Sequence, residues 1–138
     1  MNVLVDTSVW SLALRRRRDD PSRLPVVREL SALIDERRAE LIGPIRQELL
    51  SGIADARQFA ELRETLAAFV DLPLATIDYE EAAEFFNVCR ARGVQGSHVD
   101  FLICAAAARH RVAVFTTDGD FDRYARLLPV KLHQARAR

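Results

Sequence analysis

The chain has almost no lysine. Lys131 is the only one, although the 138 residues include 20 basic and 20 acidic side chains. Nearly all of the positive charge is therefore arginine, whose planar guanidinium binds phosphate through paired hydrogen bonds. Zero net charge gives no overall argument for nucleic-acid binding, but it leaves room for local basic surfaces. The arginine clusters are either phosphate contacts or solvated helix ends, and they fall at Arg15–Arg18, Arg37–Arg38, Arg90/Arg92, Arg109/Arg111 and Arg136/Arg138.

Cysteine and long apolar runs are scarce as well. Cys89 and Cys104 stand alone in apolar helical segments, which indicates buried free thiols, and the lack of close Cys/His pairs argues against a zinc site. No apolar run approaches the roughly 20 residues of a membrane helix. An acid follows only three apolar residues at the N-terminus, so no signal peptide is expected. The sequence predicts a cytoplasmic protein with no membrane association and a single domain over residues 1–138.

Short apolar runs alternate with segments of helical spacing. The runs expected as strands are Val3–Val5, Leu41–Ile42, Ala75–Ile77, Val112–Thr116 and Val130–Leu132. Helices are expected at Leu24–Ile34, from Pro44 through Ile53, at Phe59–Val70, behind an N-cap at Asp78, behind Ser97 and at Asp120–Leu127. This alternation predicts an α/β fold with a parallel sheet covered on both faces. The segment Arg15–Pro25 is expected to be a loop.

Carboxylates follow two of the predicted strands. Asp6 comes directly after Val3–Val5, and Asp118 follows Val112–Thr116. Ligands of parallel sheets bind beyond the carboxyl ends of the strands, so we expect both acids at one edge of the sheet. Two carboxylates about 4 Å apart repel by on the order of 4 kcal/mol at an effective dielectric near 20. A divalent cation with a preference for hard oxygen ligands, Mg²⁺ or Mn²⁺, would relieve that repulsion.

Two further acids lie in apolar helical segments. Glu48 flanks the apolar positions Ile45 and Leu49, and Asp100 opens a helix so apolar that most of its faces must be buried. Each acid also has a structural explanation taken singly. Asp6 and Asp118 suit turns after strands, Glu48 suits a helix surface, and Asp100 and Asp120 suit capping boxes with Ser97 and Thr117.

The ordered motifs VLVDTSVW, IRQELLSGI, GSHVDFLICAAA and VFTTDGDF resemble those of the PIN-domain ribonucleases, in particular the VapC-type toxins of bacterial toxin–antitoxin pairs. The resemblance covers essentially the whole chain. It implies a three-layer α/β/α fold with a central, mainly parallel sheet. It also implies Mg²⁺-dependent cleavage of RNA.

The resemblance assigns the site residue by residue. Asp6, Glu48, Asp100 and Asp118 look like the four catalytic and metal-binding acids of the family, and Asp120 like an additional acid found in part of it. Thr7 and Thr116 match hydroxyl positions that bond the carboxylates. Glu40 and Glu61 remain alternatives to Glu48, and His98 is expected at the surface or in a cap.

Partners also follow from the resemblance, which implies a homodimer and a small antitoxin that reaches toward the acids. Apolar positions of the segments around Trp10–Leu14 and Leu24–Leu33 are a candidate groove for the antitoxin, or else part of the core. Two other functions stay open: an inactive or regulatory protein of the same fold, and an Asp-nucleophile phosphohydrolase. The phosphohydrolase requires a second acid two residues after Asp6, where this chain has Ser8.

Overall fold

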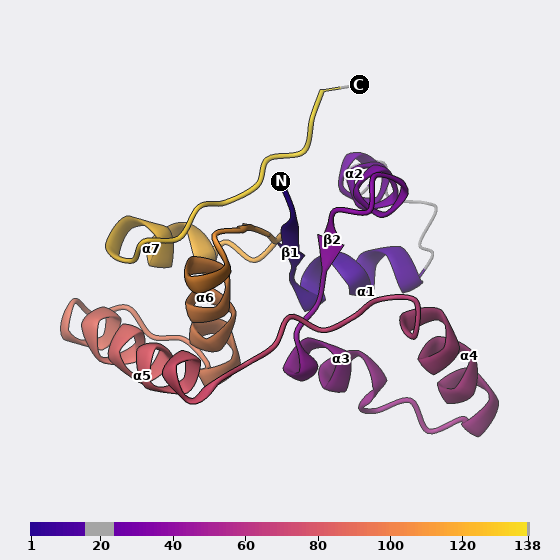
Figure 1. Ribbon diagram of the computed structural model, residues 1–138, viewed down its shortest axis with the longest axis horizontal. Helices are drawn as coiled ribbons and strands as arrows, with labels where there is room; N and C mark the ends of the chain where they lie inside the picture. The colour runs from indigo at the N-terminus through magenta and orange to yellow at the C-terminus, as the bar shows by residue number, and fades with distance from the viewer. Residues whose placement is uncertain (16–23, 138) are drawn as a thin grey trace.

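Three short parallel strands form the centre of the computed structural model, which describes residues 1–15 and 24–137 (Figure 1). They are β1 (Val3–Val5), β2 (Ala39–Glu40) and β3 (Ala113–Phe115), in the order β2-β1-β3. Val3 pairs with Ala39 on one side and with Ala113 on the other. All three residues of β1 are buried, which explains why this central strand is an unbroken apolar run.

Helices cover the strands on both sides, as Figure 1 shows. One side carries α1 (Thr7–Arg15), α2 (Leu24–Asp35), α3 (Gly43–Leu50) and α4 (Ala56–Leu66), and the other carries α5 (Thr76–Ala91), α6 (His98–His110) and α7 (Asp120–Leu127). This arrangement confirms the predicted three-layer α/β/α fold. No helix of the described residues is long and apolar enough to cross a lipid bilayer.

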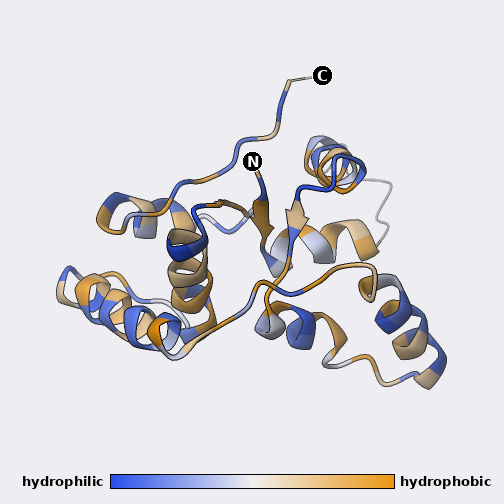
Figure 2. Cartoon of the chain, viewed as in Figure 1, coloured by the Kyte–Doolittle hydropathy of each residue, from blue (hydrophilic) through white to orange (hydrophobic). Residues whose placement is uncertain are grey.

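Helix α6 is the most deeply buried helix and packs directly on β3. Every residue from Phe101 to Ala107 is buried, while the outer helices alternate apolar and polar residues around their surfaces (Figure 2). Cys89 and Cys104 are buried free thiols, as predicted. Trp10 and Leu30 are also buried in the core, and Trp10 packs edge-on against Phe69. Trp10 and Leu30 were candidates for an antitoxin groove, and in the structure they belong to the core instead.

The strand predictions are correct for β1 and β3, but neither Leu41–Ile42 nor Val130–Leu132 is a strand, and β2 lies just before the first of these, at Ala39–Glu40. The expected strand Val112–Thr116 is observed at Ala113–Phe115, and Leu41 and Leu132 each form only a single parallel bridge beside the sheet. The expected strand Ala75–Ile77 is wrong, because α5 begins at Thr76. A three-residue apolar run cannot separate a strand from the first turn of a helix by its pattern alone.

Several helix ends also differ from expectation, and the helix expected at Phe59–Val70 is observed at Ala56–Leu66. Asp78 is not the N-cap of α5 but its third residue, and its carboxylate accepts a hydrogen bond from the backbone N–H of Ala75 at 2.8 Å. Ile53 lies beyond α3, which ends at Leu50 before a turn in which Gly52 has a φ of +86°. Most of the expected Arg15–Pro25 loop, and with it most of the first arginine cluster, lies outside the described residues.

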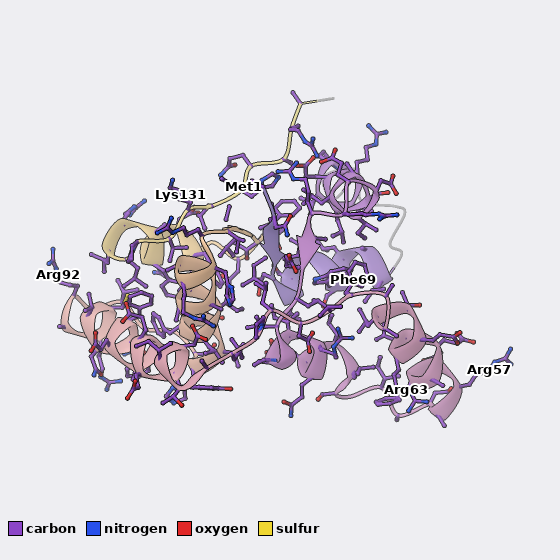
Figure 3. All side chains as sticks on the ribbon, in the orientation of Figure 1. Met1, Arg57, Arg63, Phe69, Arg92 and Lys131 are labelled. Atoms are coloured by element: carbon purple, nitrogen blue, oxygen red, sulfur yellow. The ribbon has the colours of Figure 1, made fainter. Side chains whose placement is uncertain are left out.

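Several arginines bind acids of the fold itself. Arg46 contacts Asp71 at 2.9 Å and two backbone carbonyls, and Arg109 contacts the buried Asp78 at 2.6 Å. Others project into solvent, among them Arg57 and Arg63 from the outer side of α4 and Arg92 from the end of α5 (Figure 3). Part of the arginine content is therefore explained by packing between elements.

Candidate active site

Asp6 ends β1 and is held by hydroxyl groups. Its backbone N–H donates to the carbonyl of Phe115 at 2.9 Å, which ties the end of β1 to the end of β3. Its carboxylate is 6% exposed, and Oδ2 accepts hydrogen bonds of 2.8 Å from both Ser8 and Thr116. These bonds partly replace the solvation that a buried carboxylate loses. They also fix the direction in which the carboxylate points.

Thr116 links Asp6 to Asp118. The Thr116 hydroxyl donates to Asp6 and accepts from the backbone N–H of Asp118 at 3.0 Å. Asp118 in turn uses Oδ1 to accept from the backbone N–H of Asp120 at 2.9 Å. The two acids that follow β1 and β3 are thus joined through one hydroxyl, at the edge of the sheet where the sequence places a site.

Asp100 lies in the first turn of α6 and faces the same charges. Ser97 caps the helix by accepting from the N–H of Asp100 at 3.0 Å, as the sequence predicts. Burial raises the pKa of the Asp100 carboxyl above its usual range, opposed by hydrogen bonds from Tyr124 and Ser97. The charges of Asp6 and Asp118 raise this pKa further, so the three carboxylates interact electrostatically.

Glu48 comes to the site from α3. Its Oε1 accepts from the hydroxyl of Thr7, the residue after Asp6, at 2.8 Å. The two alternative glutamates have other partners, since Glu40 accepts from Asn2 and Glu61 pairs with Arg57 at 3.4 Å. The geometry therefore favours Glu48 over Glu40 and Glu61 as the fourth acid.

Asp120 and His98 are less well placed for a role with these acids. Asp120 forms an ion pair with Arg123, one turn along α7, which supplies it with a positive charge of its own. His98 stacks on Phe86, with ring centroids 5.3 Å apart. Its ring is therefore part of an aromatic contact between α5 and α6.

The four acids share a pattern of hydrogen bonding that suits a cation. One oxygen of each acid is engaged: Asp6 Oδ2 by Ser8 and Thr116, Glu48 Oε1 by Thr7, Asp100 Oδ2 by Tyr124 and Asp118 Oδ1 by the N–H of Asp120. Within residues 1–15 and 24–137, the second oxygens of Asp6, Glu48 and Asp118 have no further hydrogen-bond partner, while the Asp100 carboxylate also interacts with Ser97. Carboxylate oxygens held in this way fit Mg²⁺ or Mn²⁺. In the part of the chain described, no group of three or more Asp, Glu, His or Cys side chains is placed to hold a metal ion as the side chains stand.

A cleft of about 250 Å³ opens beside Asp118. The Thr116–Gly119 loop forms one wall, and the segment Leu132–Ala135 forms the other. Asp118 is the one of the four acids that lines this cleft.

Two contributors to the site were not predicted from the sequence. Ser8 accepts from the backbone N–H of Thr117 at 3.0 Å as well as donating to Asp6. The position of Ser8, two residues after Asp6, is the sequence feature that could have indicated this contact. Tyr124 donates its hydroxyl to Asp100 at 2.7 Å, and both burial and Asp100 raise the pKa of Tyr124, so it stays a neutral donor. Its helical spacing indicates only a core position.

Comparison with known proteins places this arrangement among related chains. The family model described as "PIN domain" matches residues 3–127. Ribonuclease VapC11 of Mycobacterium tuberculosis is 31% identical over 127 residues, which cover 91% of this chain and 92% of the relative. The structure of VapBC-1 from nontypeable Haemophilus influenzae superposes with a TM-score of 0.74 at 13% identity, covering 97% of this chain and 98% of the other. A toxin–antitoxin complex from Klebsiella pneumoniae has a TM-score of 0.57 at 19% identity, covering 87% and 90%.

Proposed function

The chain belongs to the PIN-domain family, and on that premise we propose that it is a metal-dependent endoribonuclease acting as the toxin of a toxin–antitoxin pair. Its similarity to a VapC ribonuclease supports a nuclease. The observation that supports the metal dependence is the electrostatic interaction of Asp6, Asp100 and Asp118, two of which are also linked through the Thr116 hydroxyl. RNA is the proposed substrate and the cytoplasm the proposed place of action.

In this proposal Asp6, Asp100 and Asp118 hold one or two Mg²⁺ ions, for which Mn²⁺ can substitute, and Glu48 holds a second ion or positions the attacking water. Bound Mg²⁺ supplies an activated water and neutralises charge on the phosphate and the leaving oxygen. Ser8, Thr7 and Thr116 keep the carboxylates oriented through the 2.8 Å bonds described above. In-line hydrolysis without a covalent enzyme intermediate gives 5′-phosphate and 3′-hydroxyl ends.

The rival phosphohydrolase is less consistent with the geometry. Ser8 stands where that mechanism needs an acid, and its hydroxyl is engaged with Asp6 and Thr117. A trapped acyl-phosphate on Asp6 is the result that would favour it. An inactive or regulatory protein would bind its partners but cleave no RNA.

The metal requirement is tested by RNA cleavage. The purified protein should cleave RNA with Mg²⁺ or Mn²⁺ and stop in EDTA. Asp6→Asn should remove most of the activity, by about 100-fold or more, because an amide is a much poorer ligand for Mg²⁺. Asp35→Asn is the matched control, since Asp35 is an exposed residue at the end of α2. Full cleavage in EDTA, or by Asp6→Asn, would contradict the mechanism.

The proposed partners are a second copy of the chain and a small antitoxin protein. The antitoxin is supported by the VapBC and toxin–antitoxin structures that this fold resembles, and the second copy rests on the family resemblance alone. Sedimentation of the purified protein distinguishes a dimer from a monomer. A short neighbouring reading frame whose product blocks RNA cleavage would identify the antitoxin.

A further inference from the structure

Tyr124 is a fully buried polar side chain that reaches the site from a different element than the acids. It lies on α7, where its ring packs against Phe101 and Phe121 with centroids 4.9 and 5.1 Å away. Its hydroxyl donates to Asp100 Oδ2 at 2.7 Å. The aromatic packing leaves the ring little freedom, so the hydroxyl is held at a fixed point beneath the carboxylate.

The backbone opposite Tyr124 is shaped to admit the hydroxyl. A Cβ atom at Gly96 would lie 2.1 Å from the Tyr124 hydroxyl oxygen and 2.7 Å from the ring carbon that bears it. Only glycine leaves this space, and it stands directly before Ser97, the N-cap of α6. Ser97 thus fixes the backbone of Asp100, and Tyr124 fixes its carboxylate.

We propose that Tyr124 is a positioning residue for metal binding: its hydroxyl occupies Oδ2 of Asp100 and thereby holds Oδ1 available to the cation. The inference rests on the proposed function, because it gives Asp100 a ligand role. It assigns to Asp100 the kind of hydroxyl support that Asp6 receives from Thr116 and Glu48 from Thr7. The difference is that Tyr124 is itself fully buried.

Tyr124→Phe tests the proposal because it removes the hydroxyl and keeps the ring. Binding of Mn²⁺ is measured from the electron paramagnetic resonance signal of the free ion, and RNA cleavage is followed separately. We expect the Mn²⁺ dissociation constant to rise about tenfold or more and kcat to fall similarly, as for other residues that orient a metal ligand. KM for RNA should stay unchanged, since the buried hydroxyl does not reach the surface.

Tyr79→Phe is the matched control, because Tyr79 is the other tyrosine of the chain and is 55% exposed on α5. Asp100→Asn supplies the reference for a lost ligand. In the Asp100→Asn background, Tyr124→Phe should add nothing, since the hydroxyl acts through that carboxylate. A merely structural role would instead reduce Mn²⁺ binding equally in both backgrounds.

The outcomes separate this inference from the proposed function. If Asp100→Asn binds Mn²⁺ more weakly than wild type does, while Tyr124→Phe equals Tyr79→Phe, the positioning role is wrong and the metal site stands. If wild type binds no Mn²⁺ and cleaves RNA in EDTA, the metal-dependent function is wrong and the inference falls with it. The inference is supported if Tyr124→Phe binds Mn²⁺ more weakly than wild type and Tyr79→Phe do, while the urea midpoint of its unfolding is unchanged.

Discussion

At the scale of single residues, the tightest steric requirement near the acids falls on Gly96. Alanine there would place Cβ 2.1 Å from the Tyr124 hydroxyl and force the ring or α6 to move. We expect Gly96→Ala to lower the free energy of unfolding by about 1–3 kcal/mol, the usual cost of overpacking, and to reduce RNA cleavage as well. Urea unfolding and a cleavage assay measure the two effects.

Gly43→Ala is the control for that substitution. A Cβ at Gly43 meets nothing nearer than 3.9 Å, so Gly43→Ala should change the free energy of unfolding by less than about 0.5 kcal/mol. Equal stability of the two alanine variants would mean that the ring of Tyr124 has room to shift, and that Gly96 is not required for its position.

Single residues also show how far the sequence could predict the site. Asp6 and Asp118 stand out because each follows a strand, and parallel strands bring such positions to one edge. Tyr124 gives no such signal, because its partner Asp100 is 24 residues away and the pairing depends on how α7 packs against α6. Side-chain partners of this kind are set by tertiary packing, which periodicity does not encode.

At the scale of elements, an ion pair between the buried Asp78 and the partly exposed Arg109 connects α5 to α6. Asp78 is 1% exposed and accepts from Arg109 at 2.6 Å and from the backbone N–H of Ala75 at 2.8 Å. Asp78→Asn keeps the shape but loses the charge-assisted bonds to Arg109. We expect a loss of about 1–2 kcal/mol in the free energy of unfolding at pH 7, measured by urea unfolding against Asp35→Asn.

The same pair predicts how stability depends on pH. The Arg109 hydrogen bond holds the pKa of Asp78 below its usual range. A lowered pKa in the folded state means that this stabilisation is complete above the ordinary Asp pKa of about 3.9 and is lost as pH falls through the folded value. The difference between wild type and Asp78→Asn should therefore shrink below about pH 4. A difference that grows on acidification would contradict the assignment.

Elements whose pattern is long and periodic could be predicted, and short ones could not. The sequence gives α6 correctly because Ser97 caps it and an apolar stretch follows. It fails at Ala75–Ile77, where Asp78 bonds back to the N–H of Ala75 and starts a helix instead of ending a strand. Such a choice is made by one local hydrogen bond, and in three residues both patterns look alike.

At the scale of the whole molecule, the layers follow from the alternation of strands and helices, but the course of the C-terminal segment does not. Residues after α7 run beside β3, where the N–H of Val114 donates to Lys131 and its carbonyl accepts from His133, both at 2.8 Å. The segment then reaches α2, where His133 and Arg136 bind Glu29. No sequence pattern links Glu29 to His133 and Arg136, which lie more than 100 residues further along the chain.

The contact of the C-terminal segment with Glu29 leads to a prediction about stability. Glu29 is 0% exposed, and Arg136 lies 3.1 Å from it and 3.0 Å from Glu36. Removing residues 133–138 removes His133 and Arg136, which both contact the buried Glu29 carboxylate. We expect a loss of at least about 2 kcal/mol in the free energy of unfolding, because a buried charge is costly once its partners are reduced. Removing only residues 137–138 is the control and should change little.

The sign of Glu29→Gln distinguishes this cause from a general loss of packing. In the full chain the substitution should destabilise, because it removes the charge that His133 and Arg136 bind. In the chain shortened to residue 132 it should stabilise, because a neutral amide is less costly to bury than a carboxylate with fewer partners. Urea unfolding of the four proteins measures both effects. The same sign in both backgrounds would show that the C-terminal segment stabilises the fold by covering apolar surface, and that its pairing with Glu29 contributes little.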